Sequence, residues 1–417
     1  MGSTIDTRYQ DFIADYWKNV TKKIKKLKRK GLFENAEIRI EWGHPKYPMD
    51  GTYEDLIKAL TYFDTCITYE NRFLKIINDN NSLNKWVDIE GEYYRLLKES
   101  IENPDDEGAY NIEDLNRDFR VIKDKLTDYL KKIEGEHRSD NSIAIKNTIG
   151  IKVYQAFSYS DFSSIVQNKI ARQELEQLRK EKKLIAEGNV FAVDRLNSYR
   201  EELIKSIAQE PNPLELVKYR LRAKSASDYF FIEPENILFL NFNYTNSHRP
   251  YVDHQMTDNF GDHSSPATSS ISIHGSIYDQ ENNPIIFGFG DELDEEYKDI
   301  ENLNDNRYLE NIKSINYLES GSYKSLLQYI ESGYYEIFIF GHSCGISDRT
   351  LLNTMFEHDN CASIKVFYHE REDGGDNYSD IVRNISRNFN DKVKMRDRVV
   401  NKGDCKPLVE GVVKEMV

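Results

Sequence analysis

Short apolar runs of strand length constrain this chain most, and they gather in its C-terminal half. Residues 236–242 (NILFLNF) form a continuous apolar run, as expected for a strand that is buried on both faces. Further strand candidates are 271–274 (ISIH), 284–289 (PIIFGF), 335–340 (YEIFIF) and 363–369 (SIKVFYH), with a helix expected over 348–358. Strands that alternate with helices predict an α/β fold with a parallel, doubly wound sheet.

Helical spacing of apolar residues dominates the chain before residue 226. Helices are expected over 8–31, 52–80, 83–102, 112–134 and most of 142–225, whereas 247–269 is predicted to be a mobile loop because it is rich in Ser, Asp, His and Gly. We therefore predict three segments. They are an N-terminal helical segment of the core (1–140), a helical insertion (141–235) and a sheet region that carries the site (236–417).

Charge and cysteine content narrow the class of protein. The chain has 56 Lys and Arg against 71 Asp and Glu, a formal net charge of −15. This charge repels phosphates, so neither general nucleic-acid binding nor binding to an anionic membrane is expected. No run approaches the ~20 apolar residues of a membrane helix. The 4 cysteines form no Cys-x-x-Cys pair, so we expect a reduced, soluble, cytoplasmic protein without a zinc ribbon.

Polar residues follow the apolar runs, where a doubly wound sheet binds its ligands. Asn243 follows the first run, and its amide could hold a ribose oxygen or orient a water molecule. His274 follows the second run and could act as a general base on a sugar hydroxyl, because its ordinary pKa lies near neutrality. A lone histidine is more often a structural residue, so both interpretations of His274 stay open.

The segment GFGDE follows the third run and supplies Gly288 and Asp291 as candidate nucleotide ligands. The carboxylates of Asp291 and Glu292 could bind ribose hydroxyls or a metal ion. An acidic, solvated loop is an equally good interpretation of these two residues.

The segment GHSCG (341–345) follows the fourth run and allows three interpretations. It matches Gly-x-Ser-x-Gly, which would make Ser343 a nucleophile on a strained turn. That mechanism needs an acid and then a histidine on later strands, and His369 follows Ser343 too closely for both. The second interpretation is a turn that requires glycines. The third is a phosphate or ribose site formed by Gly341, His342 and Ser343 at a helix N-terminus.

Five motifs in this order resemble the bacteriophage abortive-infection AbiH family. They are WVDIE (86–90), FNYT (242–245), IHG (273–275), IIFGFGD (285–291) and GHSCGISDRT (341–350). The resemblance extends over most of the chain. It implies a bacterial antiphage defence protein whose activation halts growth or kills the infected cell.

The AbiH family in turn resembles the sirtuins, which have a Rossmann-type parallel sheet. This resemblance implies that Asn243 and His274 are catalytic and that Gly341, His342 and Ser343 bind the cofactor. The implied reaction is cleavage of the nicotinamide–ribose bond of NAD, with NAD as substrate and no further cofactor required. Thr245 departs from the pattern, because sirtuins have Asp there. The sirtuin zinc module is missing as well.

The start of the chain departs from the family more seriously. AbiH proteins usually begin with a strand and a Gly-Asn-Gly-Phe-Asp turn, whereas MGSTIDTRYQDF resembles the stretch of chain just after that turn. We expect either a truncated chain or a member that has lost its phosphate-binding turn. A non-enzymatic sensor that binds a nucleotide or a phage protein is therefore the competing class, and a nuclease is the third. A phage protein as trigger and a homo-oligomer are compatible with the large helical surface.

Overall fold

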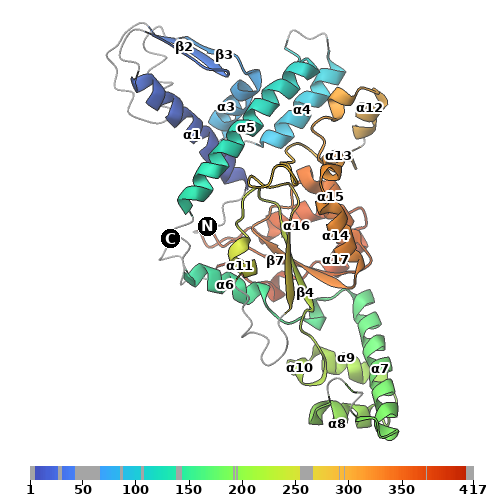
Figure 1. Cartoon of the computed structure of the whole chain (residues 1–417). Helices are drawn as coiled ribbons and strands as arrows, with labels where there is room; N and C mark the ends of the chain where they lie inside the picture. Colours follow the sequence, from blue (N-terminus) through green and yellow to red (C-terminus); the bar gives the residue numbers. More distant parts are fainter. Residues whose placement is uncertain are drawn as a thin grey trace.

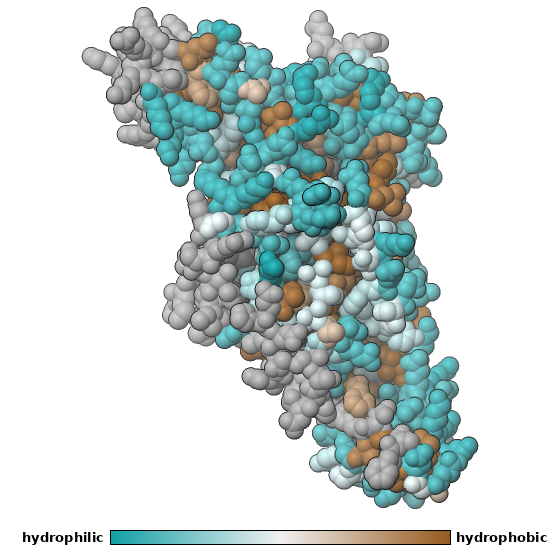
Figure 2. All heavy atoms as spheres, viewed as in Figure 1, coloured by the Kyte–Doolittle hydropathy of each residue, from teal (hydrophilic) through white to brown (hydrophobic). Residues whose placement is uncertain are grey.

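The computed structural model describes residues 5–26, 31–42, 66–84, 88–104, 108–137, 143–190, 193, 196–253, 266–290, 292–294, 296–371 and 373–409. These residues form an N-terminal lobe at one end, an α/β core in the middle and a helical arm at the other end (Figure 1). Each region has its own cluster of buried apolar side chains. On the face shown in Figure 2, hydrophilic residues cover most of the lobe, while neutral and hydrophobic residues gather over the middle.

The N-terminal lobe combines helices with a small antiparallel sheet. Its elements are α1 (Ile5–Lys26), β1 (Gly31–Glu34), β2 (Ile38–Trp42), β3 (Cys66–Tyr69), α3 (Arg72–Asn84), α4 (Ile89–Glu102) and α5 (Ile112–His137). The strand order is β1-β2-β3, with Phe33 opposite Ile40 and Ile40 opposite Ile67. The helix predicted over 52–80 is wrong at residues 66–69, because this β-branched and aromatic stretch pairs with β2. The earlier part of that prediction, 52–65, lies outside the described residues.

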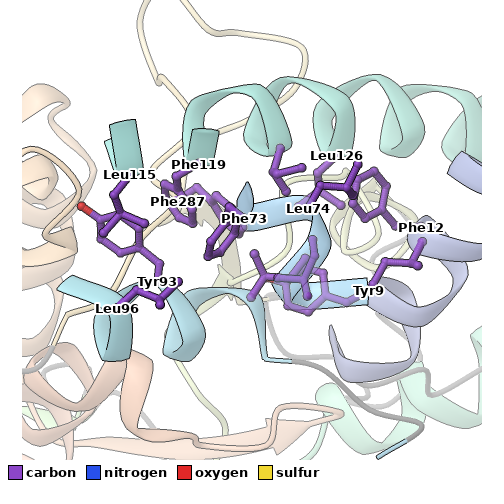
Figure 3. Packing of buried hydrophobic residues seen from close by; sticks show 14 of the residues in the cluster. Tyr9, Phe12, Phe73, Leu74, Tyr93, Leu96, Leu115, Phe119, Leu126 and Phe287 are labelled. Carbon is purple, nitrogen blue, oxygen red and sulfur yellow. The ribbon is translucent and has the colours of Figure 1, made fainter. Parts of the chain in front are cut away.

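Aromatic rings fill the core of this lobe (Figure 3). Phe119 of α5 stacks on Phe287 with ring centroids 4.9 Å apart, and Phe73 of α3 meets Phe119 edge to face at 5.5 Å. Phe287 belongs to the segment predicted as a third strand of the sheet, which is wrong because 284–289 forms no strand in the structure. Ile285, Phe287 and Phe289 pack into the N-terminal lobe instead, whereas Ile286 packs into the core.

The α/β core contains two parallel, two-stranded sheets. One pairs β4 (Asn236–Asn241) with β5 (Ala267–Ser272), and the other pairs β6 (Tyr335–Phe340) with β7 (Cys361–Phe367). Helices of the core are α11 (Arg249–Asp253), α13 (Lys313–Asn316), α14 (Ser322–Glu331), α15 (Arg349–Glu357), α16 (Tyr378–Arg387) and α17 (Lys392–Arg398). The short helix α12 (Tyr297–Asn302) packs against the N-terminal lobe instead (Figure 1). The α/β class and the parallel pairing are confirmed. The single continuous sheet is not observed, since no ladder joins β4 to β6 among the described residues.

A helical arm extends from the core, and its helices lie within the range 142–225 for which helices are predicted, apart from α10, which lies just after it. It contains α7 (Ser164–Ala186), α8 (Ser198–Ser206), α9 (Pro213–Arg222) and α10 (Ala226–Tyr229), whereas α6 (Ile143–Val153) lies beside the core (Figure 1). Arg200 and Glu181 form a buried ion pair at 2.8 Å between α8 and α7. None of the described helices combines the length and the apolar character that a membrane span requires.

The predicted loop over 247–269 is only partly a loop. Residues 249–253 form α11 and β5 begins at Ala267, while 254–265 lie outside the described residues. β5 therefore begins and ends earlier than the predicted run 271–274. This leaves His274 beyond the strand, in the turn after it.

Candidate functional site

The carboxyl ends of β4, β5 and β6 meet around His274. The ring Nδ1 of His274 lies 3.2 Å from the carbonyl oxygen of Phe242, which directly follows β4. Its Nε2 lies 3.0 Å from Oδ1 of Asp348, in the turn between β6 and α15. The rings of Phe242 and His342 are 4.2 Å apart. The structure therefore brings together three of the segments that the sequence singled out.

A chain of buried charges continues from this point into the N-terminal lobe. Lys313, at the start of α13, places its Nζ 2.9 Å from Oδ1 of Asp348 and 2.9 Å from Oε2 of Glu90 in α4. The side chain of Lys313 is only 1% exposed. Such a cation is stable only when it is paired, so Glu90 and Asp348 are what permit Lys313 in the interior.

The buried charges shift one another's pKa values. Burial raises the pKa of Glu90 to about 7, although Lys313 opposes the shift. Burial lowers the pKa of Lys313, but Asp348 and Glu90 raise it more, so the ammonium group stays charged. Burial raises the pKa of Asp348, yet Lys313 and His274 lower it more, so the net pKa lies well below the ordinary value. At neutral pH the network thus contains a Lys313–Asp348 ion pair and a Glu90 carboxyl close to its titration point.

His274 is enclosed by this network. Its side chain is 2% exposed, and burial lowers its pKa, which Lys313 lowers further against the attraction of Asp348. The neutral imidazole can donate from Nε2 to the carboxylate of Asp348. The hydroxyl of Tyr317 lies 3.4 Å from the same nitrogen. His274 therefore lies between the ends of β4 and β6 inside the protein, and its neighbours Ile273 and Gly275 are buried as well.

The GHSCG turn has a conformation that its first glycine makes possible. Gly341 has a φ of 67°, in the left-handed region that favours glycine. The Nδ1 atom of His342 accepts a hydrogen bond from the backbone N–H of Cys344 at 3.0 Å, and its Nε2 faces Oδ2 of Asp348 at 3.6 Å. Asn384 of α16 donates to the carbonyl oxygen of Ser343 at 2.8 Å. The turn is thus held in place by α16 and by the buried network.

Asn243 faces the other side of the same opening. The side chain of Asn241 donates to the carbonyl oxygens of Asn243 and Thr245, at 2.9 and 2.8 Å, and so fixes the turn after β4. The amide of Asn243 is half-buried and donates to Ser247 Oγ at 3.1 Å. Asn243 lines a largely apolar cavity of about 440 Å³, together with the predicted residues Gly341, His342 and Ser343.

The remaining predicted ligands are separate from this cavity. Gly288 lies where the chain passes the carbonyl oxygen of Asn311, and a Cβ atom there would come within 2.0 Å of that oxygen. Its backbone N–H points to Oε1 of Glu90 at 3.4 Å. The structure therefore gives Gly288 a packing role beside the network. Asp291 lies outside the described residues.

A second, polar cavity of about 650 Å³ lies alongside the end of β5. Hydroxyl and amide side chains dominate its lining, which includes Arg249 of α11 and Ser322 of α14. Ser272 and Ser276, on either side of His274, also line it. His248 lines both cavities, so the two openings adjoin at the loop after β4.

Sequence reasoning missed the roles of three residues in the network. Glu90 and Asp348 lie in the motifs WVDIE and GHSCGISDRT, and this position marks them as candidates. The motifs do not indicate that both carboxylates pair with the same lysine. Lys313 stands in no motif, and only the fold brings it to the site. Within the described ranges, no group of three or more His, Cys, Asp or Glu side chains is arranged to hold a metal ion.

These features define a mixed α/β protein whose parallel strands end at a buried network of carboxylates, lysine and histidine. The family model described as bacteriophage abortive infection AbiH matches residues 1–369. The chain belongs to this family, as its motifs indicated, and the family's role is abortive infection, a defence of bacteria against phage. No curated protein and no solved structure matches the chain.

Proposed function

We propose that the protein contributes to abortive infection by hydrolysing NAD or a related nucleotide at the nicotinamide–ribose bond. The observation that carries the proposal is the convergence of three parallel strand ends on His274, with Asn243, His342 and Ser343 at the opening beside it. Water would add to C1 of the ribose as nicotinamide leaves, which yields ADP-ribose, nicotinamide and one proton.

The roles follow from where each side chain lies. Asn243 is half-buried at the opening, so its amide can orient the attacking water. The backbone of Gly341–Ser343 can receive a phosphate or a ribose oxygen, since it leads toward the helix that begins at Arg349. His274 lies behind them, with its Nδ1 3.2 Å from the carbonyl oxygen of Phe242 in the turn after β4. We assign it a positioning role in which its Nε2 contact fixes Asp348 beneath the opening.

The same proposal assigns a sirtuin-like arrangement to the core. Parallel pairing in both sheets, a His-Gly pair after β5 and a Gly-x-Ser turn after β6 support it. Thr245 is buried and its carbonyl accepts a hydrogen bond from Asn241. This residue therefore shapes the turn that presents Asn243, in place of the acidic side chain that sirtuins have there.

Nicotinamide release from NAD by the purified protein tests the proposal. We expect Asn243→Ala to lower the rate by about 100-fold or more, the usual effect of losing a catalytic group. His274→Gln should lower the rate as well, because it removes the contact that fixes Asp348. Asn282→Ala and His358→Gln are matched controls on other surfaces and should retain the wild-type rate. Thermal melting of each variant separates loss of chemistry from loss of folding. The proposal is contradicted if the wild-type protein releases no nicotinamide, or if the Asn243→Ala variant releases it at an unchanged rate.

The burial of His274 favours a second candidate, a nucleotide sensor without turnover. Both ring nitrogens of His274 face protein acceptors, and its side chain is 2% exposed. A sensor would bind ADP-ribose or NAD in a calorimetric titration but release no nicotinamide. The side chain of His342 lines the opening, so His342→Ala tests this candidate. If the protein is a sensor, this variant should lose phage protection in cells only when it also loses nucleotide binding.

A further inference from the structure

β5 is an unusually polar strand for a parallel sheet. Four of its six residues are Ser or Thr, in the sequence ATSSIS, whereas strands of parallel sheets are normally apolar. Its partner β4 is apolar, although it is half-buried over most of its length rather than buried on both faces as the sequence predicted. Ser270 and Ser272 are two residues apart on β5, so their hydroxyls point to the same face of the sheet. Both line the polar cavity of about 650 Å³.

Two helices and a loop form this polar cavity together with β5. α11 and α14 both pack against β5, and they contribute Arg249 and Ser325 to the lining. The loop that follows β5 contributes Ser276, Tyr278, Asp279 and Asn283. β4 and β6, which the structure describes in full, contribute none of the lining residues. The polar cavity is therefore separate from the apolar cavity that β4 and β6 line.

Backbone hydrogen bonds hold the loop after β5 in one conformation. The N–H of Ser276 donates to the carbonyl of Asn283 at 3.1 Å, and the N–H of Ile286 donates to the carbonyl of His274 at 2.9 Å. Gly275 makes the turn possible, because its φ is 85° and a Cβ atom there would lie 2.0 Å from the backbone carbonyl oxygen of Pro284. This wall of the cavity is therefore preformed, and a ligand can bind without the entropic cost of ordering the loop.

Asn283 joins β5 to α14 in the wall of the cavity. Its amide donates to the carbonyl oxygen of Ser272 at 2.9 Å, and its Oδ1 accepts from the hydroxyl of Ser322 at 3.3 Å. The Oγ of Ser272 in turn accepts from the amide of Asn241 at 3.4 Å. Because Asn241 also fixes the turn that presents Asn243, the wall of the polar cavity is continuous with the support of the proposed NAD site.

The lining offers both donors and acceptors to a ligand. The hydroxyl oxygens of Ser272 and Ser276 accept hydrogen bonds from within the protein, so each hydroxyl can still donate its hydrogen. The hydroxyl of Ser322 donates to Asn283, so its lone pairs can still accept. Asp279 accepts from a neighbouring amide through Oδ1 and has Oδ2 as a further acceptor. Hydroxyl groups, which donate and accept at the same atom, match this mixture better than groups that do only one.

The charges and the one aromatic ring of the lining narrow the ligand further. With histidine neutral, Arg249 and Asp279 carry the only full charges among the described lining residues. Their opposite signs leave the lining without net charge, which favours a neutral ligand over an ion. The ring of Tyr278 is 48% exposed and offers an apolar face to the C–H groups of a sugar ring. The volume lies within the range of about 300–1,000 Å³ that is typical of small-molecule sites.

We propose that the polar cavity beside β5 binds a neutral, polyhydroxylated ligand, at a site separate from the proposed NAD site. The ligand presents a sugar ring, either of a free saccharide or of a nucleoside. Its hydroxyls exchange hydrogen bonds with the serines of the lining and with Asn246 and Asp279, while Tyr278 covers one face of the ring. The polar sequence of β5 then has a function, because its serines replace water around the ligand.

Saturation-transfer NMR on the full chain is the first measurement. Trehalose and maltose are the probes for a free saccharide, and adenosine and uridine are the probes for a nucleoside. We expect saturable binding of at least one probe, and the probe that binds identifies the source of the sugar ring. If none of these probes binds, the proposal is overturned.

Two analogues of the probe that binds test the chemical class of the ligand. A deoxy analogue lacks one hydroxyl and should bind about tenfold more weakly, because it leaves a polar group of the lining without its partner. A phosphate ester of the same probe, such as trehalose 6-phosphate or AMP, should bind no more tightly than the neutral probe. Equal binding of every deoxy analogue, or tighter binding of the phosphate ester, contradicts a site for neutral hydroxyl groups.

Protein variants place the bound probe in this cavity. Tyr278→Ala and Asn246→Leu should each weaken binding by about tenfold or more, since they remove the ring and a hydrogen-bonding amide from the lining. Tyr219→Ala and Asn168→Leu are matched controls on exposed faces of α9 and α7, outside the cavity, and should bind the probe as the wild type does. Circular dichroism establishes that all variants fold. Unchanged affinity in both cavity variants would overturn the proposal, and because nicotinamide release enters none of these measurements, the result is independent of the NAD proposal.

Discussion

The charge of Glu90 changes when the pH varies near neutrality, because its pKa lies at about 7. Burial raises its pKa from 4.5 to about 7, so between these values the folded protein keeps a proton that the unfolded chain has released. The stability contributed by this proton is present at low pH and is lost as the pH rises toward 7. Between pH 6 and pH 8 the loss is about 1 kcal/mol.

Glu90→Gln tests this assignment because it removes the titration and keeps the size of the side chain. As the pH rises from 6 to 8, the urea midpoint of the wild type should fall relative to that of Glu90→Gln. Glu99→Gln changes an exposed side chain on the same helix. Its urea midpoint should therefore change between pH 6 and pH 8 as much as that of the wild type. If the wild type and Glu90→Gln shift in parallel, Glu90 titrates in the ordinary acidic range.

Single residues were predictable from the sequence only where a local pattern marked them. Asn243, His274 and Ser343 could be singled out because each follows an apolar run of strand length. Lys313 carries no such mark, and its partner Glu90 is 223 positions away in the chain. Ion pairs of this kind depend on the packing of one lobe against another, which neither periodicity nor motif spacing expresses.

At the scale of elements, Gly288 fixes how closely the segment after β5 passes the segment before α13. A Cβ atom at this position would lie 2.0 Å from the carbonyl oxygen of Asn311, a backbone atom that cannot swing away. We expect Gly288→Ala to destabilise the protein by about 2 kcal/mol or more, measured as a lower urea midpoint. Gly333→Ala is the control, because a Cβ atom there meets nothing within 4 Å. Equal midpoints for the two variants would contradict the close approach.

The helices were predicted well because their apolar residues recur at the helical period over many turns. α5 and α15 match their predicted ranges within three residues, whereas α1 ends five residues before its predicted end and α4 begins six residues after its predicted start. The small sheet β1-β2-β3 was missed, since each strand has only four or five residues and the pattern of so short a segment fits helix or strand alike. The pattern of residues 284–289 predicts a strand, but in the structure the aromatic side chains of this segment pack into the core of the neighbouring lobe.

At the scale of the whole molecule, two kinds of contact join the N-terminal lobe to the α/β core. One is polar, the Glu90–Lys313–Asp348 chain. The other is apolar, where Phe287 and Phe289 of the core segment enter the lobe and Phe289 stacks on Tyr94 at 4.1 Å. Because both contacts lie next to His274, the position of the lobe is coupled to the geometry of the site.

Phe287→Ala should loosen this coupling more than any surface change. The ring is 1% exposed and stacks on Phe119, so its removal leaves a cavity that costs about 3–5 kcal/mol. We expect hydrogen exchange to accelerate in α1 and α5 and in the turn that carries His274, while α7 and α9 of the helical arm keep wild-type rates because they belong to another cluster. Phe231→Ala, at a side chain that is 56% exposed, is the matched control and should leave α1 and α5 unchanged. Uniform acceleration across lobe, core and arm would show instead that the molecule unfolds as one cooperative unit and that Phe287 is not a specific link between lobe and site.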